Sequence, residues 1–191
     1  YLAWKALCDQ KSWFFDKNIN DRLRGVGRLE SLNIILMLNN IYLNEDGKRK
    51  AMDYKNRIYC ESLKQMTPKD VEPEVAQALR ILKNKGYKLA IGSSSNNAKM
   101  ILKQIELIDY FDVIVDGTMI TKGKPNPEVF LKAASLLNID PSCLYVVEDA
   151  VSGIQAAIKG NFIPVAYRTS DYRIDSNIWH INSFLELVMV L

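Results

Sequence analysis

The sequence predicts an α/β protein, in which an all-helical segment is followed by a Rossmann-like parallel sheet covered by helices. Short apolar strand candidates alternate with amphipathic helices from residue 69 onward, and this alternation is typical of parallel sheets with both faces covered. No convincing strand occurs before Thr67-Pro68, where apolar residues recur at helical spacing instead. We therefore expect two domains, a helical one over residues 1–68 and an α/β one over residues 69–191.

Apolar periodicity predicts the helical segment. Leu29, Leu32 and Leu36 recur three and four residues apart, as on one face of an amphipathic helix. Similar spacing continues over Lys48–Leu63, and Tyr1–Trp4 has the pattern of a helix interior. We expect this segment to fold without strands.

The second segment contains four strand candidates, separated by helices. The expected strands cover residues 87–92, 111–115, 144–147 and 162–166. The expected helices cover residues 75–82, 98–108, 127–137 and 150–159, with Gly86 and Gly160 as stops after the first and the last. Ligands of such sheets bind at the carboxyl ends of the strands, so polar residues at those points are candidates for a functional site.

The composition excludes several classes of protein. With 48% hydrophobic and 25% charged residues, the 191-residue chain is typical of a globular protein. The net charge of +3 comes from 25 basic and 22 acidic residues without a long single-sign run, which argues against nucleic-acid or membrane partners. Cys8, Cys60 and Cys143 are too few and too scattered for a disulfide framework. Without a bilayer-length apolar stretch or a leader pattern, we expect a cytoplasmic protein.

A loop rich in serine follows the first strand candidate. Ser93, Ser94 and Ser95, with Asn96 and Asn97, stand between this strand and the next helix. Hydroxyls and backbone N–H groups at a helix N-terminus suit an anion such as phosphate. The same residue types also cap helices routinely, so this segment alone leaves both interpretations open.

A lysine lies in a rigid turn after the second strand candidate. Pro125 removes a backbone donor and restricts Lys124 to an extended backbone. Such a lysine can direct its ammonium group across the strand ends, although a solvated turn lysine is the alternative.

Two adjacent carboxylates end the third strand candidate. Glu148 and Asp149 follow apolar Val146-Val147 and precede a helix. One or two carboxylates, together with substrate phosphate, are the usual ligands of Mg²⁺ in proteins. The alternative is an acid pair stabilised by the helix dipole.

A fourth motif lies in the helical segment. Gly25, Val26 and Gly27 separate Arg24 from Arg28. The glycines free the backbone between helices, and the arginines offer forked donors suited to phosphate. By itself this is equally well a helix–helix turn with surface arginines.

In chain order, the serine loop, the Lys-Pro turn and the Glu-Asp strand end resemble the second, third and fourth motifs of the haloacid dehalogenase superfamily of phosphotransferases. The helical segment resembles the cap domain of its beta-phosphoglucomutase group, so the resemblance covers nearly the whole chain. It implies that Ser93 and Lys124 act on the transferring phosphoryl group. It also implies that Glu148 and Asp149 bind Mg²⁺.

The resemblance extends to the expected substrate contacts. Gly25-Val-Gly-Arg28, followed by Glu30-Ser31-Leu32, is similar to the mutase cap signature G-V-S-R-x-x-S-L. It implies that Gly25, Val26 and Arg28 bind the distal phosphate region of the sugar and that Lys55 lies near the sugar. Similarity of the serine loop to the mutase pattern A-S-x-S-x-N implies substrate contacts, which are Ser94, Ser95, Asn96 and Asn97. The sequence departs from the mutases at Gly27, where they have Ser, and at Asn96, where Lys is common.

The superfamily's first motif, Asp-x-Asp on a leading strand, does not occur in this sequence. That motif supplies the nucleophile, the general acid/base and a metal ligand. Tyr1–Leu7 resembles the helix that follows it, so we expect a segment with this motif to precede Tyr1 in the intact enzyme. We expect the 191 residues alone to be inactive in phosphoryl transfer.

The resemblance implies Mg²⁺-dependent phosphoryl transfer on a sugar phosphate through an aspartyl-phosphate. The expected reaction converts beta-glucose 1-phosphate to glucose 6-phosphate by way of glucose 1,6-bisphosphate, in a monomer. One alternative is a sugar-phosphate or phosphoglycolate phosphatase of the same superfamily. The other is a non-catalytic binding domain with the same fold.

Overall fold

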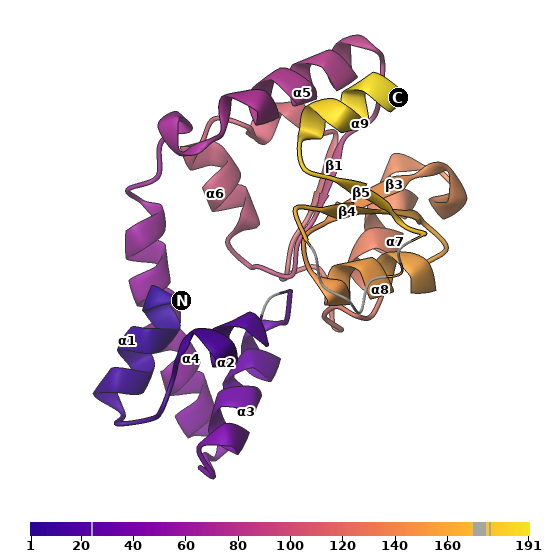
Figure 1. Ribbon diagram of the computed structural model, residues 1–191. Coiled ribbons are helices and arrows are strands. Elements are labelled where there is room, and N and C mark those ends of the chain that lie inside the picture. Colours follow the sequence, from indigo (N-terminus) through magenta and orange to yellow (C-terminus); the bar gives the residue numbers. More distant parts are fainter. Residues whose placement is uncertain (24, 170–174, 176) are drawn as a thin grey trace. The chain divides into compact units, whose positions relative to one another are not determined.

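The computed structural model describes residues 1–23, 25–169, 175 and 177–191 (Figure 1). The chain divides into two compact units, Tyr1–Gln65 and Met66–Leu191. The boundary expected after residue 68 falls just inside the second unit. Among the residues that the structure describes, no helix combines the length and the apolar character needed to cross a membrane.

The described part of the first unit is helical, as expected. Its helices are α1 (Leu2–Gln10), α2 (Lys17–Asp21), α3 (Arg28–Leu38) and α4 (Glu45–Leu63). Side-chain caps begin two of them, because Asp16 accepts from the Ile19 N–H and Asn44 from the Gly47 N–H. α1 packs against α4, and one cluster of buried side chains forms the core, which includes Trp4, Leu7, Cys8, Phe15, Ile19, Leu32, Ile35, Leu36 and Ala51.

The second unit alternates helices and strands, and the α/β prediction is confirmed. Its helices are α5 (Pro73–Asn84), α6 (Ala98–Gln104), α7 (Glu128–Leu137), α8 (Val151–Lys159) and α9 (Phe184–Val190). Its strands are β1 (Ala90–Gly92), β2 (Val113–Val115), β3 (Tyr145–Glu148), β4 (Ile163–Tyr167) and β5 (Trp179–Ile181). Three short 3₁₀ helices complete the described elements, and they are η1 (Pro68–Asp70), η2 (Ile108–Tyr110) and η3 (Pro141–Cys143).

The strands are all parallel, but they form two sheets where one was expected. β1 pairs with β2, with Gly92 opposite Val115, and β4 lies between β3 and β5, with Glu148 opposite Ala166. Among the described residues, no ladder joins the two sheets. They share instead an apolar cluster, which includes Val115, Val129, Phe130, Val146, Ala156 and Ala157. Parallel pairing brings the ends of β1 and β2 to one edge and those of β3 and β4 to another.

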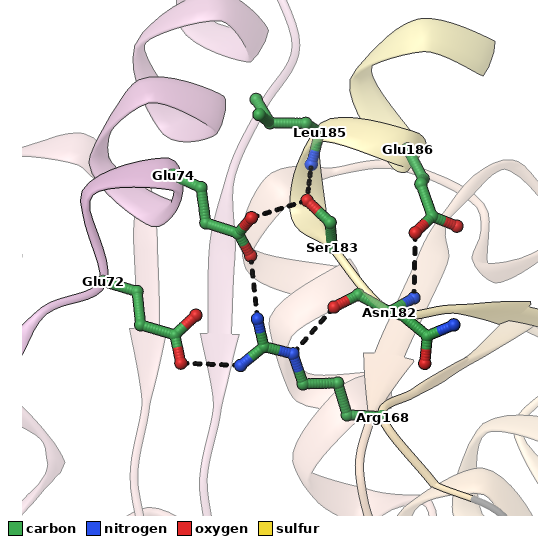
Figure 2. A network of polar contacts seen from close by, with 7 residues as sticks. All are labelled: Glu72, Glu74, Arg168, Asn182, Ser183, Leu185 and Glu186. Atoms are coloured by element: carbon green, nitrogen blue, oxygen red, sulfur yellow. Dashed lines mark hydrogen bonds and ion pairs between the residues drawn. The ribbon is translucent and has the colours of Figure 1, made fainter.

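The carboxyl-terminal elements β5 and α9 were not predicted from the sequence. They complete the second unit, because Ile181, Leu187 and Val188 pack against Ala78 and Leu82 of α5. Polar contacts at the same place centre on Arg168, which follows β4 with φ = 45° (Figure 2). Its guanidinium donates to Glu72 at 2.6 Å and to Glu74 at 3.2 Å, and its Nε donates to the Asn182 carbonyl at 2.7 Å.

Candidate active site

The serine loop, residues 93–97, follows β1 and enters α6. Ser93 continues the pairing with β2, because its N–H donates to the Val115 carbonyl at 2.9 Å. The Ser93 hydroxyl accepts from the Ser95 N–H at 3.1 Å, and the Ser95 hydroxyl accepts from the Asn97 N–H at 3.2 Å. Both hydroxyls therefore shape the loop as acceptors, and within the described chain neither donates its own proton. Each retains a donor for a phosphoryl oxygen.

The turn that follows β2 shapes the serine loop from the other side. The Gly117 N–H donates to the Ser95 carbonyl at 3.1 Å. An added Cβ on Gly117 would overlap the Ser94 carbonyl oxygen and Asn96 Oδ1 and would stand 3.0 Å from the Ser94 carbonyl carbon. The loop backbone can therefore lie directly on this turn only because Gly117 has no side chain.

The same turn contains a buried carboxylate that the sequence analysis did not single out. Asp116 is only 4% exposed. It accepts from the Thr118 N–H at 2.9 Å and from the Thr118 hydroxyl at 2.6 Å, and Lys99 Nζ lies 3.9 Å from its other oxygen. A polar residue directly after an apolar strand was the signal that could have identified it.

Within the serine loop, Ser94 is in an unusual environment. Its hydroxyl oxygen is buried and, in the part of the chain that the structure describes, has no hydrogen-bond partner. Buried hydroxyls are normally paired, because leaving one unpaired costs about 1–3 kcal/mol. Binding of a ligand that reaches this hydroxyl would remove that cost.

Lys124 and Glu148 form a buried ion pair at the end of β3. Their side chains are only 7% and 11% exposed. Burial raises the pKa of the Glu148 carboxyl, while the charge of Lys124 and its hydrogen bond act in the opposite direction. The lysine and the strand end that the sequence singled out separately are therefore brought together.

Two residues that the sequence analysis did not select for the site enclose this pair. The Lys124 ammonium lies over the ring of Phe130, 4.7 Å from its centroid. Gly153 of α8 lies against the carboxylate, because an added Cβ there would overlap Glu148 Cδ and Oε2 and stand 2.7 Å from its Cγ. Phe130 and Gly153 thus confine the two charged side chains.

The donor set at this strand end fits a hard divalent cation. Glu148 and Asp149 are adjacent, and the Asp149 N–H hydrogen-bonds to the Glu148 carboxylate. Within the described residues, no three acidic, histidine or cysteine side chains form a cluster that could enclose a metal ion. Mg²⁺ requires less, since one or two carboxylates bind it together with water and phosphate oxygens. The residues present therefore fit Mg²⁺ that shares its coordination with substrate.

In the first unit, the glycine motif forms the turn before α3. Gly25 has φ = 72°, a left-handed conformation that favours glycine. Gly27 is the N-cap residue of α3, and Arg28 is its first residue. Val26 donates its N–H to the Leu23 carbonyl at 3.2 Å, which closes the turn. Arg24, the other arginine of this motif, lies outside the described residues.

Arg28 and Lys55 form a cationic site in the first unit. Burial and the nearby charge of Arg28 lower the pKa of the Lys55 ammonium to about 8. The ammonium lies 4.3 Å from the ring centroid of Tyr59 and 5.1 Å from that of Trp4. No carboxylate among the described residues pairs with either cation. Two neighbouring cations of this kind are suited to bind an anion such as phosphate.

The comparison with known families agrees with this fold and these motifs. The chain belongs to the haloacid dehalogenase-like hydrolase family, whose model matches residues 6–161. Within that family it falls in the beta-phosphoglucomutase-like subgroup. The resemblance drawn from the sequence motifs is confirmed.

Three relatives illustrate this placement. The chain is 41% identical over 159 residues to beta-phosphoglucomutase of Bacillus subtilis, covering 82% of this chain and 70% of the relative. It is 31% identical over 160 residues to the phosphorylated carbohydrates phosphatase of Thermotoga maritima, covering 82% and 71%. The crystal structure of beta-phosphoglucomutase from Clostridium difficile superposes with a TM-score of 0.92 at 31% identity, covering 98% of this chain and 84% of that one.

Proposed function

We propose that this protein is a Mg²⁺-dependent beta-phosphoglucomutase, which converts beta-glucose 1-phosphate to glucose 6-phosphate. The buried pair of Lys124 and Glu148 at the end of β3 is the observation that carries this proposal. A buried ammonium at this strand end offers positive charge that stabilises the negative charge on the oxygens of a transferring phosphoryl group. Identity of 41% to the Bacillus subtilis enzyme supports the choice of mutase.

In the proposed reaction, the second unit positions the transferring phosphoryl group. Lys124 donates to its equatorial oxygens, and the hydroxyls of Ser93 and Ser95 donate the protons that the loop leaves available. Ser94, Asn96 and Asn97 line the same loop and complete the proposed contacts with substrate. Glu148 and Asp149 would hold Mg²⁺, which neutralises charge on the phosphoryl oxygens.

The first unit supplies the proposed site for the phosphate that is not transferred. Arg28 and Lys55 are two neighbouring cations without a carboxylate partner among the described residues. Gly25 and Val26 form the turn that precedes Arg28. A bisphosphate intermediate needs such a second anion site, because either phosphate must be bound while the other reacts.

We also propose that the attacking carboxylate belongs to the superfamily's Asp-x-Asp motif on a further strand. Among the described residues, β1 and β3 each have a single strand neighbour, so each leaves one edge unpaired. A parallel strand joining these edges would bring its carboxyl end to the serine loop and to Glu148. Open edges of this kind are normally covered in a folded protein.

Phosphorus NMR of the intact protein tests the mutase proposal. With Mg²⁺ and a trace of glucose 1,6-bisphosphate, beta-glucose 1-phosphate should yield glucose 6-phosphate without release of inorganic phosphate. Chelation of Mg²⁺, or Asp149→Ala, should abolish turnover because a hard ligand is lost. Turnover that is unchanged in Asp149→Ala contradicts the metal assignment.

A phosphatase is the second candidate, because the Thermotoga maritima relative is a phosphatase of phosphorylated carbohydrates. It predicts inorganic phosphate as the product, with no requirement for glucose 1,6-bisphosphate. A non-catalytic domain predicts binding of the sugar phosphate with neither product. The same NMR experiment therefore separates all three.

A further inference from the structure

The ring of Phe130, near the start of α7, makes three contacts, two of which are with elements of the candidate active site. One face lies under the Lys124 ammonium at 4.7 Å. The ring also lies against β1, because an added Cβ on Gly92 would stand 2.7 Å from Phe130 Cδ1 and 2.9 Å from Cε1. Phe162 packs edge to face with it, with ring centroids 5.9 Å apart. The Phe130 ring thus contacts both Lys124 and β1, the strand that leads into the serine loop.

The chemistry of Lys124 explains why a ring suits this position. A lysine has a flexible stem, so it needs partners on more than one side to be held in one place. Glu148 holds the Lys124 ammonium through an ion pair. A carboxylate, however, also offsets the positive charge that the ammonium would otherwise offer to a phosphoryl group. An aromatic face attracts the ammonium through its quadrupole, by about 0.5–2 kcal/mol, and adds no opposing charge.

We propose that Phe130 is a positioning residue for the reaction, which holds the Lys124 ammonium in place and fixes it relative to the serine strand through Gly92. This inference rests on the proposed function, because it assigns Lys124 to the transferring phosphoryl group. The lack of a side chain at Gly92 is part of the same arrangement, since any Cβ there would push the ring away.

Fluorination of the ring in the intact protein tests the electrostatic part of the proposal. One, two and three fluorines on Phe130 weaken its quadrupole stepwise with little change in size. Turnover of beta-glucose 1-phosphate should fall at each step, by about two- to thirtyfold in total, which is the range of one cation–π contact. The affinity for inorganic phosphate should fall in the same order.

Phe162 is the matched control. It is buried to the same extent as Phe130, at 6% against 7% exposed, and it packs on Phe130, whereas the described structure places no cation over its ring. The same fluorine series at Phe162 should leave turnover and phosphate affinity nearly unchanged, because no cation among the described residues lies over that ring for its quadrupole to attract. Equal losses at the two positions, or no loss at Phe130, would overturn the proposal.

Proton NMR tests the contact without any assay of activity. The ring current of Phe130 should shift the ε-methylene protons of Lys124 upfield, and Phe130→Leu should remove this shift. An unchanged shift in Phe130→Leu refutes the contact. If the wild-type protein proves not to turn over the sugar phosphate, the proposed function fails, while the ring-current and phosphate-affinity measurements still decide this inference.

Discussion

The carboxyl group of Glu148 lies directly against Gly153, so that any side chain on this glycine would overlap it. Gly153 is the third residue of α8, where the helix begins immediately beyond the strand end. Close approach of the helix backbone to the carboxylate therefore depends on the absence of a Cβ at this position. Two contacts therefore restrict the Glu148 side chain, which are the backbone of α8 at Gly153 and the ion pair with Lys124.

Gly153→Ala should therefore displace Glu148 and lower both Mg²⁺ affinity and turnover. A shift of about 1 Å at a reacting centre costs on the order of a hundredfold in rate. Titration with Mg²⁺ and initial rates would measure both effects. Gly47→Ala is the matched control, because Gly47 is also the third residue of its helix, and the nearest atoms to an added Cβ there, Asn44 Oδ1 and two atoms of Leu43, lie at 3.3 Å or more. Equal behaviour of the two variants would argue against the proposed constraint.

Lys124→Met should destabilise the protein, because it leaves Glu148 buried without its counter-ion. Breaking a buried ion pair by removal of one partner costs roughly 3–5 kcal/mol. Urea unfolding at pH 7 would measure this loss. If Lys124 were simply a solvated turn residue, the change in unfolding free energy would be near zero.

The same variant should also make stability depend more strongly on pH. Burial already raises the folded-state pKa of Glu148, and loss of Lys124 removes the charge that lowers it. The folded state then binds the proton more tightly than the unfolded state, so stability is fully present below the ordinary carboxyl pKa and is lost as pH rises through the folded-state value. Adding Glu148→Gln to Lys124→Met should remove this dependence, and its persistence would assign it to another group.

Arg28→Ala should affect mutase activity selectively. If Arg28 binds the phosphate that is not transferred, its loss should lower conversion of beta-glucose 1-phosphate by about 10- to 150-fold, since hydrogen bonds to charged groups contribute about 1.5–3 kcal/mol. Hydrolysis of acetyl phosphate by the intact protein should persist, because that substrate has no second phosphate. Arg57→Ala is the control, an exposed arginine that stacks on Tyr54. A proportional fall in both reactions would favour a general structural role for Arg28.

Binding of glucose 6-phosphate should weaken above pH 8 because of Lys55. Burial and the charge of Arg28 lower its pKa to about 8 in the free protein, and a bound phosphate would raise it again. Affinity is therefore complete below pH 8 and falls as pH rises through the window between the free and bound values. Isothermal titration calorimetry from pH 7 to pH 10 would measure this fall in affinity for glucose 6-phosphate. Lys55→Arg, which remains protonated throughout, should bind without this decline, and a wild-type profile in that variant would exclude Lys55 as the titrating group.

The strands and helices that the sequence predicted are those with a strong local pattern. β3 has the apolar pair Val146-Val147 in its centre, and α4 extends over 19 residues with a side-chain cap at Asn44. Short length does not explain why β5 and α9 were missed, since the predicted β1 and β2 also have three residues and α6 has seven. The apolar residues of β5 and α9 pack against α5, which is far away in the chain, and local periodicity does not reveal such contacts.

The sequence singled out Lys124 and Glu148, which the structure brings together in an ion pair, but not the residues that contact them. Glu148 stands out in the sequence because it directly follows apolar strand residues, and Lys124 stands out because Pro125 restricts its turn. Phe130, Gly153 and Gly117 have the appearance of ordinary core or turn residues. Their importance arises from close approach in three dimensions, which a single sequence does not encode in any local spacing.

The contacts around Arg168 bear on how the second unit folds as it is synthesised. Ser183 donates to Glu74 across a separation of 109 residues (Figure 2), and α5 packs against α9 over a similar span. Closure of such a long chain loop is entropically costly and slows folding. Helix α5 leaves the ribosome well before its partner exists, so the apolar face of Ala78 and Leu82 stays uncovered meanwhile. Apolar surface that stays exposed during such an interval favours aggregation, which chaperones counteract.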